Sequence, residues 1–327
     1  MDTHPESRSA AKTTGHSARL KALGVVVSIA IAATAVFALV HALKKVDFDK
    51  VLGVIGETNL GLIALALLLV ATSYWSLTFY DLFALRTIER TDIPYRIAAL
   101  ASFTSYPIAH GIGAVALIAP VIRYRIYSRH GLSVFDVANI SFLTGLTFWL
   151  GNLTALGLSV LWEPNSIGVI DFLPAPGNRA VAVALLAGVV AFLVWSWRSA
   201  GRIGPARWSV KLPSGPMALL QIGLGIADLS AAALAMYVLI PADMNIDMFR
   251  AIAVFIAAML LGFASHAPAG LGAFDATILI GLGDPDREEP LIAALLIFRF
   301  LYHLLPFALA LALFGAVEGR RSLRAKA

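Results

Sequence analysis

The chain has 327 residues, of which 59% are hydrophobic and only 14% charged, and its mean hydropathy is +0.82. Soluble domains carry about 25% charged residues, so this composition predicts an integral membrane protein with several spans. The net charge of +5 does not indicate a nucleic-acid partner, because the basic residues fall in short loops and tails, where they orient a membrane protein. No cysteine is present, which excludes disulfides, thiolate metal ligands and cysteine nucleophiles.

The N-terminal region combines a polar tail with a long apolar run. Residues 1–18 are polar and predict a disordered cytoplasmic tail. The run 20–43 exceeds the apolar region of about 7–15 residues in a cleaved signal peptide, so it predicts a first transmembrane helix. Other runs are long enough to cross about 30 Å of hydrocarbon. They are 58–82, 134–161, 179–198, 215–240 and 289–315.

Arginine and lysine clusters set the predicted orientation. One cluster precedes the run 20–43, and one lies at the C-terminus. The others follow the run 58–82, the run 179–198 and a further apolar region, 96–126. Placing all of them in the cytoplasm gives one topology with both termini cytoplasmic. The loop with Lys44, Lys45 and Lys50 then lies outside and is the exception.

Two apolar regions, 96–126 and 249–283, are broken near their middle by glycine and proline. Backbone that leaves a helix inside a membrane persists only where protein or a wet cavity satisfies its hydrogen bonds. A matched pair of interrupted segments, one in each half, is the pattern of a substrate site in a transporter built from two repeats. The alternative is that both breaks are ordinary helix kinks.

These features predict an all-α fold built as an inverted repeat. The first repeat covers 19–162 and the second 179–316, each with three spans and a broken re-entrant hairpin, or about eight transmembrane segments. An external loop, 163–178, joins the repeats, and a cytoplasmic tail, 317–327, follows them. Outside the two breaks the halves do not repeat in sequence.

Glycines at the breaks are the first candidate site residues. A helix that begins inside the membrane offers free N–H groups and a partial positive charge, which suit phosphate or carboxylate. Gly111, Gly113, Gly270 and Gly272 would let the backbone approach such a ligand closely. The alternative is close helix packing through small residues. His110 and His266, beside the breaks, are weaker candidates that could simply cap backbone.

Charged residues within the apolar runs are the second group. Such side chains cost roughly 2.5–3.5 kcal/mol at a helix centre and are functional candidates by default. Asp228 lies in the run 215–240, Arg299 and His303 are four residues apart in the last run, and Asp275 follows the second break. Arg299 would hold a lipid phosphate, and Asp228 or Asp275 a cationic group or a proton. The alternative is a structural Asp–Arg pair between helices.

Arg123, Arg125 and Tyr127 belong to a basic and aromatic cluster that follows the first break. Such a cluster either anchors a helix at the interface or contacts phosphate head groups. The sequence lacks a Walker loop, a dinucleotide fingerprint, a His-Glu-x-x-His motif and a Gly-x-Ser-x-Gly motif. We therefore expect no cofactor, no metal and no catalytic residue.

Three segments resemble the membrane region of lysylphosphatidylglycerol synthases, the multiple peptide resistance factor proteins, and their stand-alone relatives. The segment 123–133 is similar to the family's Arg-x-Arg-x-Tyr…Gly-Leu-Ser pattern, and 148–151 to its following helix. The segment 265–275 is similar to the motif Ser-His-x-Pro-Gly-Gly-x-Gly-x-Phe-Glu and adds His266 and Pro268 to the candidate residues. The chain departs from the family at Ala119-Pro120, where a Gly-Gly pair is usual, at Ala269 for glycine and at Asp275 for glutamate.

The resemblance implies a flippase that moves aminoacylated phosphatidylglycerol to the outer leaflet and so favours resistance to cationic antimicrobial peptides. Full-length members add an aminoacyl transferase domain, and because this chain stops at Ala327 we expect no transferase activity. We therefore expect translocation of an anionic or zwitterionic phospholipid. Alternatives are a secondary transporter of a small polar or lipid-linked precursor, a membrane partner of a separate lipid-modifying enzyme and, more weakly, a membrane-embedded transferase. A homo-oligomer is also compatible with the sequence.

Overall fold

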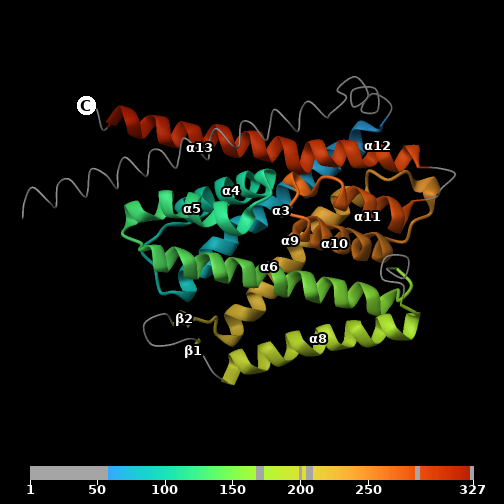
Figure 1. Cartoon of the computed structure of the whole chain (residues 1–327), viewed down its shortest axis with the longest axis horizontal. Coiled ribbons are helices and arrows are strands. Elements are labelled where there is room, and N and C mark those ends of the chain that lie inside the picture. Colours follow the sequence, from blue (N-terminus) through green and yellow to red (C-terminus); the bar gives the residue numbers. More distant parts are fainter. Residues whose placement is uncertain (1–57, 167–172, 199–200, 204–208, 284–287, 325–327) are drawn as a thin grey trace, which may run out of the picture.

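The computed structural model describes residues 58–166, 173–198, 201–203, 209–283 and 288–324. The predicted tail 1–18, the predicted first helix 20–43 and the loop with Lys44, Lys45 and Lys50 lie outside the described residues. So does part of the predicted loop 163–178. Within the described part, the chain is almost entirely helical (Figure 1).

Five apolar helices are long enough to cross a membrane, judged by length and composition over the described residues. Four are single helices, and the fifth is a continuous run of α12, a π-helical segment (η4) and α13. The prediction of an all-α membrane protein is confirmed, while the inverted repeat of eight segments stays a prediction. The elements are α3 (Leu60–Thr87), α6 (Val134–Trp162), α8 (Ala175–Arg198), α9 (Gly215–Tyr237), α12 (Glu289–Phe298), η4 (Arg299–Leu304) and α13 (Leu305–Arg324).

Local sequence sets where several of these helices begin. At the start of α6 the Ser133 hydroxyl accepts a hydrogen bond from the Asp136 N–H, and the Asp136 carboxylate accepts one from the Ser133 N–H. This capping box satisfies amide groups that the first turn of a helix leaves free. Asn59 caps α3 in a similar way, by accepting from the Gly61 N–H. The predicted boundaries shift at several helix ends. Helix α3 continues to Thr87, α8 begins at Ala175, α9 ends at Tyr237 and α13 continues to Arg324.

Both broken regions form pairs of shorter helices. The first pair is α4 (Tyr95–Ile112) and α5 (Val115–Tyr127), which are separated by Gly113 and Ala114. The second pair is α10 (Met248–Ala264) and α11 (Ala273–Leu282), separated by a stretch that includes the short 3₁₀ helix η3 (Pro268–Gly270). The helices of each pair contact each other extensively. We call residues 113–114 the first elbow and residues 265–272 the second elbow.

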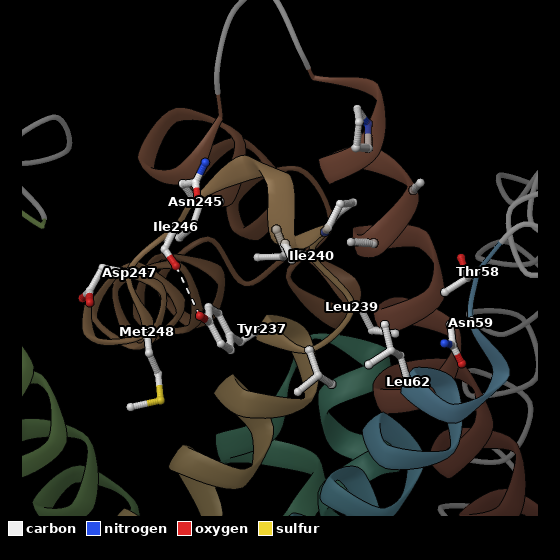
Figure 2. A pocket seen from close by; sticks show the side chains of 16 residues that line it. Thr58, Asn59, Leu62, Tyr237, Leu239, Ile240, Asn245, Ile246, Asp247 and Met248 are labelled. Carbon is white, nitrogen blue, oxygen red and sulfur yellow. Dashed lines mark hydrogen bonds between the residues drawn. The ribbon is translucent and has the colours of Figure 1, made fainter.

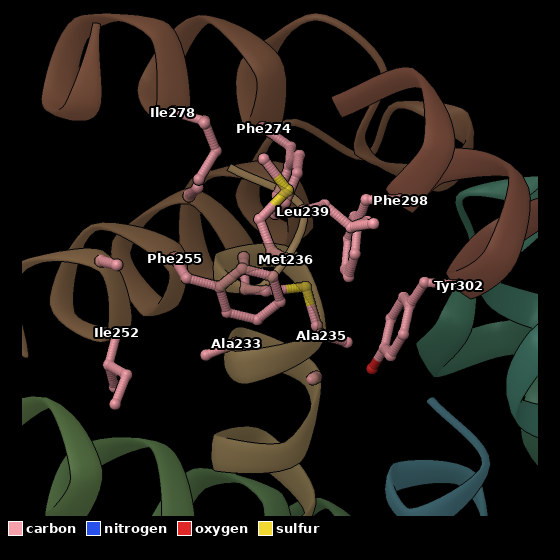
Figure 3. Close-up of a cluster of buried hydrophobic side chains, with 14 of the residues drawn as sticks. Ala233, Ala235, Met236, Leu239, Ile252, Phe255, Phe274, Ile278, Phe298 and Tyr302 are labelled. Carbon is pink, nitrogen blue, oxygen red and sulfur yellow. The ribbon is translucent and has the colours of Figure 1, made fainter. Parts of the chain in front are cut away.

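An aromatic cluster fills the core between α9, α10, α11 and α12 (Figure 3). The rings of Phe274 and Phe298 stack with centroids 6.0 Å apart, and the edge of Phe255 meets both faces. The ring of Tyr302 stacks on Phe298 at 5.0 Å. This cluster fixes the start of α11 against η4, the two elements that carry Asp275 and Arg299. A second core joins α4, α5, α6 and α13.

Helices α6 and α9 cross at two glycines. A Cβ atom added to Gly151 would lie 2.5 Å from the Cα of Gly225, so neither position has room for a side chain. Close approach through small residues is the usual way for helices to associate in membranes. The crossing places α9 between α6 and α3, which positions Asp228 against α3.

A small sheet connects α8 to α9. Strands β1 (Arg202–Ile203) and β2 (Val210–Lys211) are antiparallel, with Arg202 opposite Lys211. The Lys211 ammonium lies 2.6 Å from the Glu89 carboxylate, just after α3. This ion pair ties the linker of the second half to the end of a helix in the first half.

Candidate functional site

The two elbows lie directly against each other, although they come from opposite halves of the sequence. A Cβ atom added to Gly113 would lie 2.6 Å from the carbonyl oxygen of His266 and 3.0 Å from atoms of Ala267 and Pro268. Gly113 also has a φ of +85°, in the left-handed region. Only glycine meets both demands. Nearby, a Cβ on Gly111 would lie 3.0 Å from the Phe307 ring, so α4 also fits tightly against α13.

The backbone of the second elbow is strained. His266 and Ala269 have φ values of 53° and 51°, although neither is glycine, and Gly270 and Gly272 also have positive φ. A non-glycine residue in this region costs on the order of 1–3 kcal/mol, and such strain clusters at functional sites. The strain at Ala269 gives a physical reason for the glycine that the resembling motif carries at this position.

The second elbow is also accessible. Ser265, His266, Pro268 and Gly272 are exposed, whereas the cores of the helices on either side are buried. Gly270 is buried because it contacts Gly262 of α10. An accessible stretch of non-helical backbone between apolar helices is the kind of feature that a membrane protein keeps only where it lines a cavity or meets protein.

Asp275 and Arg299 form an ion pair beside the second elbow. The Arg299 Nε donates to Asp275 Oδ1 at 2.6 Å, and Arg299 Nη2 donates to Asp275 Oδ2. The same carboxylate accepts a bond from the Gly272 N–H at 3.1 Å. The side chains of Arg299 and Asp275 are 13% and 26% exposed, so the pair is only partly shielded from solvent. The anion site expected at the start of α11 is thus occupied by a carboxylate of the protein.

The start of α5 differs, because its N-cap residue, Ala114, makes no side-chain hydrogen bond to the first turn. Ala114, the residue before the helix, is apolar and only partly buried. The free amides of this first turn therefore keep their capacity to bind an acceptor. The two elbows together bring one uncapped helix start and one capped by Asp275 to the same region.

His110 and His303 form a second feature at the junction of the elbows. The two imidazole rings stack with centroids 5.2 Å apart and an angle of 27° between their planes. His110 precedes the first elbow in α4, and His303 belongs to the π-helical segment η4. His110 Nε2 and His303 Nδ1 are buried and make no hydrogen bond with any described residue. An unsatisfied buried polar group costs about 1–3 kcal/mol.

Residues four apart in an α-helix lie on one face. Arg299 and His303 instead lie in the π-helical turn η4, which changes this spacing around the helix axis. A π-helix is a local widening that is frequent at functional sites. Both side chains still reach the Phe274 ring, with the Arg299 guanidinium carbon 6.0 Å and the His303 ring 6.1 Å from its centroid. The two residues therefore share one environment, while each has its own partner.

Asp228 lies apart from Arg299, in the interface between α3 and α9. Its carboxylate accepts hydrogen bonds from the Ser73 hydroxyl at 2.5 Å and from the Tyr80 hydroxyl at 2.8 Å. Asp228 is 5% exposed. Over the described residues no cation pairs with it. The arrangement is a buried acid with two hydroxyl donors.

Arg123 and Tyr127 both contact Asp81 of α3. Arg123 makes a bidentate contact with the Asp81 carboxylate at 2.9–3.1 Å, and the Tyr127 hydroxyl donates to the same group at 2.8 Å. Asp81 is fully buried and Arg123 is 5% exposed. This cluster locks α5 to α3. Arg125 instead pairs with Glu318 of α13 at 2.8 Å and is closer to the surface.

Ser73, Tyr80 and Asp81 were missed by reasoning from sequence. Asp81 carried a usable signal, since an acidic residue near the end of an apolar run is expensive unless it is paired. Its partner could not be assigned, because Arg123 is far away in the chain. The hydroxyl groups of Ser73 and Tyr80 gave no signal, because such residues are frequent in apolar helices.

A separate pocket of about 940 Å³ lies away from the elbows (Figure 2). It is lined by the start of α3, the segment from the end of α9 to the start of α10, and the first turns of α12. The Tyr237 hydroxyl donates to the Ile246 carbonyl at its wall. None of the candidate residues from the sequence lines it. Across the described residues, no three His, Asp or Glu side chains are grouped to hold a metal ion.

Comparison with known proteins identifies two relatives that align along most of the chain. A protein of Synechocystis sp. described as uncharacterized is 27% identical over 266 residues, which cover 80% of this chain and 82% of the relative. Inner membrane protein YbhN of Escherichia coli (strain K12) is 27% identical over 293 residues, which cover 86% of this chain and 89% of the relative. No protein-family model matches the chain.

A shorter similarity connects the chain to larger proteins. Phosphatidylglycerol lysyltransferase of Staphylococcus haemolyticus is 45% identical over 74 residues, or 22% of this chain and 9% of that protein. The lysyltransferase of Staphylococcus aureus (strain MRSA252) is 39% identical over 88 residues, or 26% of this chain and 10% of that protein. The chain is thus similar along most of its length to an inner membrane protein and to a protein of undescribed function, and over about a quarter of its length to phosphatidylglycerol lysyltransferases.

Proposed function

We propose that this protein translocates an anionic or zwitterionic phospholipid, such as an aminoacylated phosphatidylglycerol, between the leaflets of a bacterial inner membrane. The observation that carries the proposal is the contact between the two elbows beside the partly exposed Asp275–Arg299 pair. The similarity to phosphatidylglycerol lysyltransferases supports a phospholipid as the substrate. The similarity to an inner membrane protein supports the location.

Exchange of partners at Arg299 would let the site take the lipid phosphate. Arginine binds phosphate and carboxylate with the same bidentate geometry, so a phosphate can replace Asp275 on the guanidinium. Asp275 keeps the Gly272 amide as a partner when Arg299 leaves, which lowers the cost of the exchange. The uncapped start of α5 supplies further donors across the elbow contact. Gly111, Gly113 and Gly270 let the backbone pack closely against Phe307, the second elbow and Gly262, while Gly272 stays exposed beside Asp275.

Asp228 supplies a negative group for a cationic part of the substrate. Its carboxylate is buried between α3 and α9, and Ser73 and Tyr80 orient it. An amine on the head group would add the positive partner that the described residues do not provide. Arg125 and Arg129, which share Glu318 at the end of α13, form a basic surface for collecting anionic head groups. Arg123 acts by holding α5 in place through Asp81.

An inverted repeat explains how the site could open to either side. In this topology both termini are cytoplasmic, α4 and α5 enter from the cytoplasmic face, and α10 and α11 enter from the external face. Movement of one pair against the other would open the elbow contact first to one leaflet and then to the other. The lipid phosphate would cross at the elbows while its acyl chains remain in the bilayer.

A leaflet assay in proteoliposomes tests the proposal. Purified protein is reconstituted with fluorescent phosphatidylglycerol and its lysyl ester, and dithionite quenching measures how fast lipid leaves the protected leaflet. We expect Arg299→Ala and Asp275→Ala each to slow translocation by roughly ten-fold or more, because each removes a group that must exchange partners. Arg198→Ala, at an exposed arginine that ends α8, is the control and should keep the wild-type rate. Protein that moves neither lipid faster than empty liposomes would overturn the proposal.

A further inference from the structure

The His110–His303 pair has no part in the lipid site described above, yet it lies where both halves of the protein meet. His110 is three residues before Gly113, whose backbone touches the second elbow. His303 is in η4, four residues after Arg299. A change in the interaction of these rings therefore acts on the elbow contact and on the Arg299 segment together.

Aromatic side chains surround the stacked rings. Phe263 of α10 lies 5.1 Å from the His110 ring, and Phe298 of α12 lies 5.9 Å from the His303 ring. Phe274 of α11 meets His303 at 6.1 Å. These neighbours provide no hydrogen-bond partner, which is why His110 Nε2 and His303 Nδ1 are left without one among the described residues. Each of these two imidazole nitrogens, which have no partner among the described residues, is a site to which a proton can add.

The geometry points to the His110–His303 pair as a binding site for one proton, through which lipid movement is coupled to the proton gradient. The proton leaves a hydronium ion, whose O–H bond breaks as the lone pair of one ring nitrogen forms the new N–H bond. The same proton later returns to water by the reverse step. Two protons would place like charges about one ring-stacking distance apart, so the pair takes one and not two. This inference deepens the proposed lipid translocation and rests on it for the coupling.

Charges around the pair determine whether a bound proton opens or closes the contact between the elbows. Arg299 is positive, and its partner Asp275 neutralises it only while their ion pair is closed. A proton on the pair adds a second positive charge near Arg299, which favours separation of α4 from η4 and of Gly113 from the second elbow. The neutral, stacked arrangement is the closed one. Two titratable side chains contact the rings directly, Tyr106 of α4 at His110 and Tyr302 of η4 at His303. Arg299 of η4 lies over the Phe274 ring, which His303 also meets, and carries Asp275 of α11 as its partner. Tyr74 of α3 contacts Tyr302. His266 on the second elbow is exposed, and its Nδ1 lies 2.9 Å from the Ala264 carbonyl.

A direct test measures the proton itself. Protein labelled with ¹⁵N-histidine is titrated from about pH 8 to about pH 4, around the ordinary histidine range. The spectra of wild type, His110→Gln and His303→Gln are then compared, with elution from a sizing column as a check of folding. We expect wild type to show a proton uptake shared by two histidines, and each variant to shift or abolish the titration of the remaining ring. Titration of either ring that is unchanged when the other is removed overturns the inference, and so does a pair that binds no proton over this range.

A transport test measures the coupling. A difference of about one pH unit across the membrane shifts the equilibrium of a process that moves one proton by about ten-fold. We expect this gradient to stimulate lipid translocation several-fold in wild type and in the control His130→Gln, whose residue lies in the short helix after α5. The ratio of rates with and without the gradient should fall to about one in His110→Gln and His303→Gln. A retained ratio overturns the coupling. If wild type moves no lipid at all, the proposed function fails, and the histidine titration still decides whether the pair is a proton site.

Discussion

Asp81 with Arg123 and Asp275 with Arg299 are the same pair of charges in different surroundings. The first pair is sealed between α3 and α5, with Asp81 fully buried and a third partner, the Tyr127 hydroxyl, completing its hydrogen bonds. The second lies beside an exposed and strained elbow, and both of its side chains retain some exposure. Burial, more than the identity of the residues, separates the two pairs. We propose that the sealed pair holds helices together and that the partly exposed pair exchanges partners.

The comparison also explains why charged residues persist in this apolar protein. A buried ion pair is weak support for stability on its own, but loss of one partner leaves an uncompensated charge. A partly exposed pair contributes little to stability, because solvent screens it. Asp81–Arg123 should therefore matter for folding, and Asp275–Arg299 for transport.

The largest expected effect is on the sealed pair. Arg123→Met leaves Asp81 buried without its cation, and we expect the free energy of unfolding to fall by about 3–5 kcal/mol. Reversible denaturation in detergent, followed by circular dichroism, measures this. The double variant Asp81→Leu, Arg123→Met should recover most of the loss, since no charge then remains buried. A double variant as unstable as the single one would show that the loss of stability does not come from the unpaired charge of Asp81.

A second prediction concerns the contact between the elbows. Gly113→Ala should reduce lipid translocation by roughly ten-fold or more, because its Cβ would meet the His266 carbonyl at 2.6 Å and force the elbows apart. Gly131→Ala is a matched control, since Gly131 has a similar φ of +74° but nothing within 4 Å of the added atom. Both variants carry a backbone penalty of about 1–2 kcal/mol, so only the difference between them reports on the contact. Equal translocation by the two variants would argue against a role for the contact.

The third prediction sharpens the difference between the two ion pairs. Asp275→Asn keeps the size of the side chain and removes its charge. We expect the free energy of unfolding to fall by less than it does in Arg123→Met, because Asp275 and Arg299 keep some exposure to solvent whereas Asp81 is fully buried. Measured in the same detergent, a loss as large as that of Arg123→Met would mean that the second pair is also structural.

The smallest expected effect belongs to the ion pair of Glu89 and Lys211, outside the helices. A hydrogen bond from Lys211 and its charge lower the pKa of the Glu89 carboxyl from the ordinary value of 4.5. A lowered pKa in the folded protein means that the pair stabilises above the unfolded pKa and that this contribution disappears as the pH falls through the folded pKa. Glu89→Gln should therefore lower the melting temperature slightly at neutral pH and not at all near pH 3. A difference that persists in acid would exclude this cause.

The sequence predicted the elements of this fold better than their contacts. Apolar runs located the long helices, and glycine with proline located both elbows, because these signals are local. The close crossing at Gly151 and Gly225 was not predicted, since a glycine within an apolar run does not say which helix approaches it.

The candidate site shows the same limit. Asp275 and Arg299 were recognised as costly charges, and the structure pairs them with each other. Asp228 was assigned to the same region, but the packing of α9 on α3 directs it to Ser73 and Tyr80. The π-helical turn that presents His303 depends on contacts across α12, α11 and α4, and has no local pattern.

Cross-linking of the elbows tests the central claim most directly. The natural sequence has no cysteine, so Ala114→Cys and Ala267→Cys introduce a unique pair beside the Gly113 contact. We predict that a short thiol cross-linker joins them, that the joined protein loses lipid translocation in proteoliposomes, and that a cleavable linker restores it after reduction. Cross-linked protein that moves lipid as fast as the reduced form would contradict the account.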